Sequence, residues 1–234
     1  MRITTLYDNR SSREDLIARW GFSCLIESAD RTILFDAGAD RETLRHNMAK
    51  LRIDPKKIEG IFISHAHEDH TGGLSGVLEV NPELKVYLGK SFPKTLKDAI
   101  RAWGAEPVEV HGPTQIENNV YSTGELGTGI KEQSLIIKTE KGLVVITGCA
   151  HPGIVLIARS AKEQLHEEFY LLLGGFHLGG MFDSQVDSTI DSLKELGVKR
   201  AAPCHCTGER AIELFKEAYK EDFIMNSVGN VVEI

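Results

Sequence analysis

One segment limits the folds open to this chain more than any other. From Gly60 to Gly73, the sequence GIFISHAHEDHTGG carries an apolar strand directly into four side chains that bind metals well, namely His65, His67, Asp69 and His70. Residues two apart in an extended backbone point to the same side, so His65 and His67 can hold one ion together. The chain then bends into a helix expected to begin near residue 71, and the other two side chains can turn toward a second ion roughly 3.5–4 Å from the first. We therefore predict a two-metal site at the end of this strand.

Imidazole and carboxylate ligands indicate which metals to expect. They suit zinc, iron or manganese, so we predict two divalent ions, with zinc as the first choice and iron, manganese or magnesium as alternatives. The same residues could instead be scattered surface histidines with Asp69 as the N-cap of the next helix, but four such side chains within six residues are rare by chance. A structural zinc site is also disfavoured, because such sites use closed sets of cysteines and histidines separated by longer loops.

Composition narrows the class of protein. The 234 residues are 41% apolar and show no linker or repeat, so we expect one domain over residues 1–234. A formal charge of −7 provides no basic face, so we expect a small-molecule substrate and no nucleic acid. The four cysteines are too few for a disulfide framework, and the chain shows neither a signal peptide nor the roughly 18 consecutive apolar residues of a membrane span. We expect a cytoplasmic protein without membrane insertion, and we leave homo-oligomerisation open.

Short runs typical of strands alternate with segments of helical periodicity. The predicted strands are 1–7, 22–27, 32–35, 60–63, 85–88, 135–138, 143–146 and 169–173. The predicted helices are 41–51, 71–80, 93–103, 153–167, 185–196 and 209–219. Because strands and helices do not alternate strictly, this order favours two packed sheets or one mixed sheet, covered by helices on the outside.

The segment SHAHEDHTGG resembles the HxHxDH signature of the metallo-β-lactamase superfamily, and other segments extend the resemblance over essentially the whole chain. They are ILFDAG (33–38), TGCAHPG (147–153), GGFHLGG (174–180) and PCHCTG (203–208). The last three resemble a branch that includes dihydropterin-linked ribofuranosylaminobenzene 5'-phosphate synthases. The resemblance implies an α+β fold, an αββα sandwich of two pseudo-symmetric halves in which two mixed β-sheets pack face to face with helices outside. It also implies that Asp36, at the end of a strand, supports the metal loop.

Each ion needs about three protein ligands, so further ligands must come from distant segments. His151 follows a predicted strand and is our candidate third ligand for the ion of His65 and His67. The resemblance assigns His205 to the other ion, since the superfamily has its last histidine ligand at such a position. Cys149 stands where many hydrolases of the superfamily carry a metal-bridging aspartate. Its thiolate could ligate the metals, or a small buried cysteine could merely make room.

Two further motifs carry candidate residues. His177 lies between two pairs of glycines and is, together with Asp69, a predicted catalytic residue. It could donate a proton, contact a substrate phosphate or serve only as a hydrogen-bonded structural residue. Cys204 and Cys206 flank a histidine from which an extended backbone would turn them away, so we expect them to pack in the core.

The remaining polar residues give weaker signals. Three basic residues could anchor an anionic substrate or stay solvated, namely Lys131, Arg159 and Arg210. Three histidines outside any motif are expected to make surface or local contacts, namely His46, His111 and His166. The glycine-rich segment 124–129 lacks the Lys-Ser/Thr pair of a phosphate-binding loop and is predicted to be a turn.

These residues favour an enzyme. The first hypothesis is a metal-dependent hydrolase of a small anionic substrate (a phosphoester, lactone or thioester) that uses water activated by a dinuclear site. The branch resemblance implies an alternative, a synthase-like transferase that joins a pterinylmethyl pyrophosphate to an aryl amine. A non-catalytic metal sensor is the third class, and it is disfavoured because six or more ligands with open coordination positions would serve no purpose in a sensor.

Overall fold

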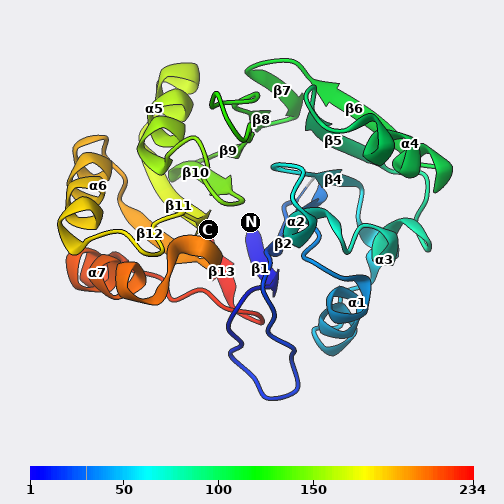
Figure 1. The fold of residues 1–234 in the computed structure, drawn as a ribbon, viewed down its shortest axis with the longest axis horizontal. Helices are drawn as coiled ribbons and strands as arrows, with labels where there is room; N and C mark the ends of the chain where they lie inside the picture. Colours follow the sequence, from blue (N-terminus) through cyan, green and yellow to red (C-terminus); the bar gives the residue numbers. More distant parts are fainter. Residues whose placement is uncertain (30) are drawn as a thin grey trace. The chain divides into compact units, whose positions relative to one another are not determined.

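The computed structural model describes residues 1–29 and 31–234 of the chain. Contacts between residues divide it into two compact units. Unit 1 comprises residues 1–110 and 227–234, and unit 2 comprises residues 111–226. Each unit contains one mixed β-sheet with helices (Figure 1). The predicted α+β fold with two mixed sheets is confirmed, and the assignment of residues 1–234 to a single domain stays a prediction.

Within the described residues, the sheet of unit 1 has the strand order β13-β1-β2-β3-β4-β5-β6. Its strands are β1 (Arg2–Tyr7), β2 (Ser23–Glu27), β3 (Thr32–Phe35), β4 (Gly60–Phe62), β5 (Lys85–Gly89), β6 (Glu106–Val110) and β13 (Val231–Glu233). Its helices are α1 (Arg41–Lys50), α2 (Glu68–Thr71), α3 (Ser75–Leu78) and α4 (Lys94–Ala102), with a 3-10 turn at Pro55–Lys57. Neighbouring strands are antiparallel from β13 to β3 and parallel from β3 to β6.

The core of unit 1 forms between its parallel strands and its helices. Leu34 on β3 and Ile61 on β4 are fully buried and belong to one apolar cluster with Leu44 of α1 and Val77 of α3. Asp40 caps the N-terminus of α1, and its carboxylate accepts a hydrogen bond from the backbone N–H of residue 43 at 2.7 Å. This packing fixes the loops that leave β3 and β4 at the same end of the sheet.

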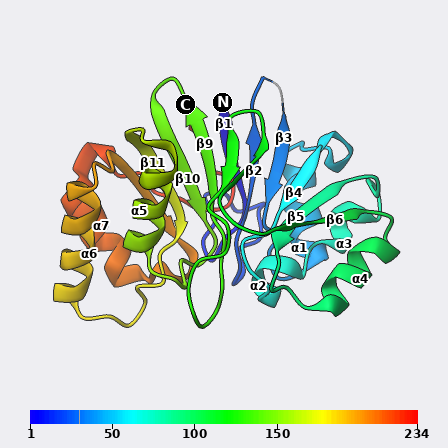
Figure 2. The ribbon, with the colours of Figure 1, turned by 90° about the horizontal axis from the view of Figure 1, so that it is seen from above.

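The sheet of unit 2 has the order β12-β11-β10-β9-β8-β7 within the described residues. Its strands are β7 (Thr114–Glu117), β8 (Val120–Ser122), β9 (Leu135–Thr139), β10 (Gly142–Thr147), β11 (Phe169–Gly175) and β12 (Arg200–Cys204). Its helices are α5 (Ile154–Leu165), α6 (Asp183–Glu195) and α7 (Glu209–Tyr219), with 3-10 turns at His205–Thr207 and Lys220–Asp222. Figure 2 shows the three helices on one side of this sheet, where Phe169, Phe176 and Phe215 are part of a second apolar cluster.

The two units have a similar strand order. Strands β1 to β6 and strands β7 to β12 each follow one another across their sheet in chain order, antiparallel at first and parallel at the end; the parallel part begins at β3 in unit 1 and at β10 in unit 2. This repetition agrees with the two pseudo-symmetric halves that the resemblance implies. The predicted metal ligands follow parallel strands in both units. Loops at the carboxyl ends of parallel strands gather at one edge of the sheet, so each sheet brings its own predicted ligands close together.

The helix predicted over residues 71–80 is wrong. The structure has two short helices there, α2 and α3, interrupted at Gly72 and Gly73. A Cβ atom at Gly72 would collide with the backbone of Ala39, and one at Gly73 with the backbone of Ala37. The close approach of this turn to the loop after β3 therefore outweighs the apolar periodicity that suggested one continuous helix.

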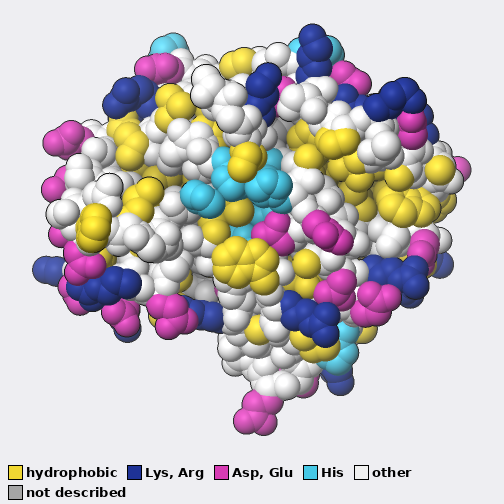
Figure 3. All heavy atoms as spheres, in the orientation of Figure 1, with side chains coloured by type: hydrophobic (Ala, Val, Ile, Leu, Met, Phe, Trp, Pro, Cys, Tyr) yellow, Lys and Arg dark blue, Asp and Glu magenta, His cyan; other side chains and the backbone are white. Residues whose placement is uncertain are grey.

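Two surface properties bear on the class of protein. Among the described residues, the helices are all too short or too polar to span a membrane. On the face drawn in Figure 3, lysine and arginine side chains are interspersed with aspartate and glutamate, so that face carries no extended basic patch among the residues drawn.

Candidate metal centre

The loop after β4 gathers the four residues of the HxHxDH motif in unit 1. The His65 Nε2 and His67 Nδ1 atoms are 3.1 Å apart, and the rings of His65 and His70 have centroids 4.2 Å apart. The His70 Nε2 atom lies 3.6 Å from a carboxylate oxygen of Asp69. The structure thus brings together the four side chains that the sequence predicts as ligands from this unit.

Asp36, at the end of β3, holds this loop in place. Its carboxylate accepts hydrogen bonds from the Ser64 N–H and hydroxyl, both at 2.7 Å, and from His70 Nδ1 at 2.6 Å. The Ser64 hydroxyl in turn contacts His65 Nδ1 at 2.9 Å. Burial raises the pKa of Asp36, while His70 and Ser64 act against that rise. Because the Nδ1 atoms of both histidines are engaged here, Nε2 is the ring nitrogen of each that is the candidate to bind a metal.

The donors of this cluster fit a divalent transition-metal ion. Three imidazoles and one carboxylate are the ligand types that zinc, iron and manganese accept. Asp36 itself adopts a φ of +51°, a conformation that costs about 1–3 kcal/mol for a residue other than glycine. Such strain at the residue that orients two histidines is typical of a functional site.

Unit 2 carries a second cluster of donors around Cys149. Ligand atoms of His151, His177, His205 and Cys206 each lie within 4.8 Å of the Cys149 sulfur, and the rings of His151 and His177 have centroids 4.5 Å apart. Cys149 and His205 are buried, while His177 is exposed. The predicted ligands of this unit are therefore close to one another, together with Cys206, which the sequence did not mark as a ligand.

A buried glutamate, Glu132, positions the loop that carries Cys149 and His151. Its Oε1 atom accepts hydrogen bonds from the Thr147 hydroxyl and from the N–H groups of residues 148, 149 and 150 at 2.9–3.0 Å. Its Oε2 atom accepts one from the N–H of His151 at 2.9 Å. Sequence reasoning missed this residue, because no local pattern links a single glutamate to a loop so far along the chain.

The structure modifies the expectation for the cysteines flanking His205. Cys204 is buried, as predicted, and its sulfur accepts a hydrogen bond from the Asn226 amide at 3.2 Å. Cys206 is buried too, but its sulfur faces Cys149 and His177. The alternation of an extended chain fails here because residues 205–207 form a 3-10 turn. Hydrogen bonds from Cys149 and His177 lower the pKa of the Cys206 thiol to about 4, and the bond to Cys206 raises the pKa of His177.

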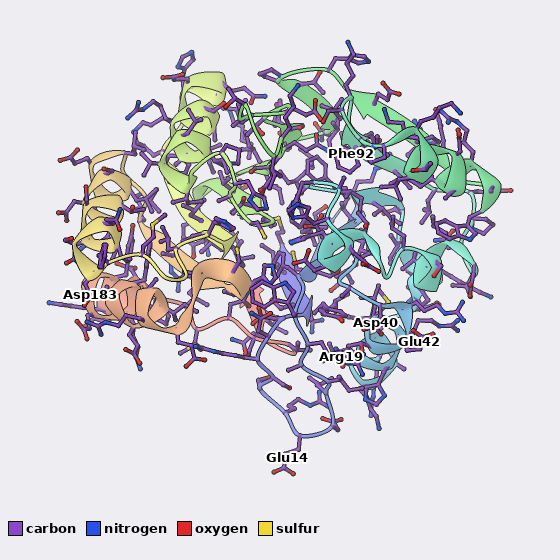
Figure 4. All side chains as sticks on the ribbon, in the orientation of Figure 1. Glu14, Arg19, Asp40, Glu42, Phe92 and Asp183 are labelled. Atoms are coloured by element: carbon purple, nitrogen blue, oxygen red, sulfur yellow. The ribbon has the colours of Figure 1, made fainter. Side chains whose placement is uncertain are left out.

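A pocket of unit 1 with a volume of about 580 Å³ lies beside Asp69. Its lining includes Trp20, which is 60% exposed, and Arg19, whose guanidinium is 3.4 Å from the Asp40 carboxylate (Figure 4). Hydrogen bonds from residue 43 and Tyr7, together with Arg19, outweigh the effect of desolvation and lower the pKa of Asp40. An exposed indole and a guanidinium next to a candidate ligand can contact a planar anionic molecule.

The structure also shows where the candidate basic residues and the glycine-rich segment 124–129 lie. Arg210 forms an ion pair with Asp183, labelled in Figure 4, at 2.6 Å and so is already engaged by a carboxylate. Lys131 and Arg159 are exposed. Gly124 has a φ of +68°, and residues 124–129 form an irregular loop with bends, in which Leu126 pairs with Glu132 through an isolated bridge.

Comparisons with known proteins agree with this arrangement. The family model described as the metallo-β-lactamase superfamily matches residues 21–205. A 7,8-dihydropterin-6-methyl-4-(β-D-ribofuranosyl)-aminobenzene-5'-phosphate synthase of Methanocaldococcus jannaschii is 33% identical, over 91% of this chain and 89% of that protein. A crystal structure described as a metal-dependent hydrolase of the β-lactamase superfamily is 30% identical, with a TM-score of 0.83 over 100% of this chain and 99% of that one. Human tRNase Z, short form, shares the fold alone, at 17% identity and a TM-score of 0.64 over 100% of this chain and 99% of that one.

Proposed function

Since the chain belongs to the metallo-β-lactamase superfamily, we propose that it is a metal-dependent hydrolase that acts on a small anionic substrate, namely a phosphoester, a lactone or a thioester. The observation that carries this proposal is the contact network of Asp36, which orients two histidines of the HxHxDH motif. A buried carboxylate that accepts the ring N–H of a histidine supports a metal site, because metal-ligating histidines almost always donate their second ring nitrogen to such a partner.

Both donor clusters take part in the proposal. One ion would be held by His65, His67 and His151, and the other by Asp69, His70 and His205, of which His205 is assigned from the resemblance. Cys149 is the candidate to contact either ion. Divalent ions held in this way would supply Lewis acidity, which polarises a phosphoryl or carbonyl oxygen and makes water a stronger nucleophile at neutral pH.

The protein's own groups would move the protons. We assign Asp69 to accept the proton of the attacking water at its carboxylate, beside His70. His177 would donate a proton from its ring to the leaving group, since its contact with Cys206 favours the imidazolium form. Trp20 and Arg19, which line the pocket next to Asp69, would orient the substrate by contact with a planar group and an anionic group.

A second function is favoured by two specific observations. Cys149 stands in place of a bridging carboxylate, and the synthase of Methanocaldococcus jannaschii is 33% identical over most of both chains. In a transfer reaction, an aryl amine nitrogen would form a bond to the methyl carbon of a pterinylmethyl pyrophosphate, the carbon–oxygen bond would break, pyrophosphate would leave with the electron pair, and the amine would lose a proton. The residues that bind the anionic leaving group would be the same.

Metal content tests the common part of the two candidates. Elemental analysis of the purified protein should give two equivalents of transition metal, with losses in His67→Ala and in His205→Ala. His111→Ala is the control, because His111 is exposed and belongs to neither cluster. Protein that retains no ion after refilling with zinc, iron or manganese would refute a metal-dependent function.

Product analysis separates the two reactions. The loaded enzyme is incubated with a phosphodiester, a lactone, a thioester, and a pterinylmethyl pyrophosphate with and without an aryl amine. Hydrolysis in the absence of amine supports the first function. Pyrophosphate release that requires the amine, with no hydrolysis of the other probes, would replace it by the transferase.

A further inference from the structure

We propose that Cys149, His177 and Cys206 form a binding site for a thiophilic metal ion, such as Zn²⁺ or Cu⁺, within unit 2. The two sulfur atoms and a ring nitrogen of His177 all lie within 4.8 Å of one another. The inference goes beyond the proposed function, since neither the hydrolase nor the transferase requires Cys206 or a second role for His177.

The sheet of unit 2 explains why these three residues meet. Strands β10, β11 and β12 are parallel neighbours, with Thr147 paired to Gly174 and Gly175 paired to Cys204. Each of the three loops that leave these strands carries one donor. Because the strands end level with one another, their loops deliver the donors to one place at the sheet edge.

Local backbone features leave room for the sulfur of Cys206. A Cβ atom at Gly175 would lie 2.7 Å from that sulfur, so only glycine fits at this point of β11. His177 and Ala150, which follows Cys149, have φ values of +52° and +58°. Residues other than glycine rarely adopt such backbone conformations. These conformations persist where the surrounding structure holds the residue in place, which is frequent at functional sites.

The donor set selects the class of ion. Two thiols and one imidazole are soft ligands that favour zinc or copper(I) over magnesium, calcium or manganese. Cys149 and Cys206 are only 3% and 8% exposed, while His177 faces solvent. An ion can therefore enter from the side of His177 and keep an open coordination position there, as in zinc sites with three protein ligands.

Binding here would also affect the proposed reaction. An ion at the thiol site would engage His177, the proposed proton donor, and Cys149, the residue available to both sites. An excess of thiophilic ions that fill the site of Cys149, His177 and Cys206 would therefore inhibit the proposed reaction.

Cobalt(II) titration of the full-length protein under a non-thiol reductant tests the site. Thiolate ligation gives cobalt(II) a strong near-ultraviolet charge-transfer absorption that imidazole and carboxylate do not give. The variants are Cys206→Ser, His177→Ala and His67→Ala. The matched control is Cys204→Ser, which removes a neighbouring buried thiol whose sulfur contacts Asn226.

The wild-type protein should show absorption from two thiolates. Cys206→Ser should lose about half of it, His177→Ala should keep its intensity but bind at least about tenfold more weakly, and Cys204→Ser should match the wild type. His67→Ala should retain the thiolate absorption even where it loses the ions of the HxHxDH motif, which separates this site from the proposed function.

Three results would overturn the proposal. They are an absence of thiolate absorption in the wild type, an unchanged titration in Cys206→Ser, and loss of the absorption in His67→Ala. Should Cys206→Ser fail to fold, His177→Ala decides alone, because His177 is exposed and its removal leaves the core intact. An unchanged midpoint in that variant would exclude the site.

Discussion

Replacement of Glu132 by glutamine should destabilise unit 2 far more than the loss of one negative charge suggests. The carboxylate is 1% exposed and accepts five hydrogen bonds from residues 147–151. Glutamine keeps the shape, but its NH₂ group must face at least one N–H that the carboxylate now satisfies.

The magnitude follows from these bonds. Hydrogen bonds to a charged acceptor are worth about 1 kcal/mol more than neutral ones, which gives about 4 kcal/mol for the four bonds to Oε1. The N–H of His151, left opposite a donor, adds about 1–3 kcal/mol. Relief from burying the charge offsets part of this sum, so we expect Glu132→Gln to lower the free energy of unfolding by about 3 kcal/mol.

The assay is urea unfolding followed by far-ultraviolet circular dichroism, which reports on both units. Tryptophan fluorescence is an internal comparison, because Trp20 and Trp103 both lie in unit 1. Glu140→Gln, which removes a charge from an exposed position before β10, should shift stability by less than about 0.5 kcal/mol. A Glu132→Gln midpoint equal to that of the control would show that the five bonds contribute nothing net, and the reasoning would be refuted.

Three further predictions concern unit 1 and the tyrosines. Asp36→Asn, which weakens a 2.6 Å bond to a ring nitrogen of the HxHxDH loop, should lower zinc affinity about 10–100-fold by competitive chelator titration, and unchanged affinity would exclude the orienting role. Gly73→Ala should lower the free energy of unfolding, measured by tryptophan fluorescence, by about 3 kcal/mol. Gly129→Ala, whose added Cβ meets nothing within 4 Å, should leave it unchanged; equal stabilities of the two variants would contradict the close approach of residue 73 to the backbone of Ala37. Burial raises the pKa of Tyr7 and of Tyr219 above the ordinary 10.0, so each contributes stability that is complete below about pH 10 and lost as pH rises through the folded-state pKa. In an alkaline titration followed by phenolate absorbance, part of the absorbance change should occur above the ordinary tyrosine pKa, and this part should be smaller in Tyr7→Phe. Ionisation of all five tyrosines together near pH 10 would disprove the prediction.

Sequence reasoning located most of the sheet-forming segments and erred where long-range contacts decide. The strand 32–35 and the helix 209–219 match β3 and α7 residue for residue. Strands β6, β7, β8, β12 and β13 were missed. All of them except β8 lie at sheet edges, where apolar patterning is weak; β6 contains Pro107, and β8 and β13 are short.

In the candidate site, too, residues that are close in the chain were predicted and residues that meet through strand pairing were missed. The HxHxDH residues are close in the chain, so their grouping follows from local geometry and was predicted. Glu132 and Cys206 reach Cys149 only through the pairing of β10 with its neighbours, and a single sequence contains no direct signal of that pairing. The helix expected over 71–80 failed for a related reason, since the backbone that excludes it belongs to another loop.

The pairing of β13 with β1 has a consequence for synthesis on the ribosome. β13 lies beyond the whole of unit 2 in the chain, yet it completes the sheet of unit 1 (Figure 1). While unit 2 is being translated, β1 therefore presents an unpaired edge, the kind of surface to which other nascent strands or chaperones add. Substitutions that weaken the pairing of β13 with β1 should lower the yield of newly made protein before they lower the stability of the folded protein.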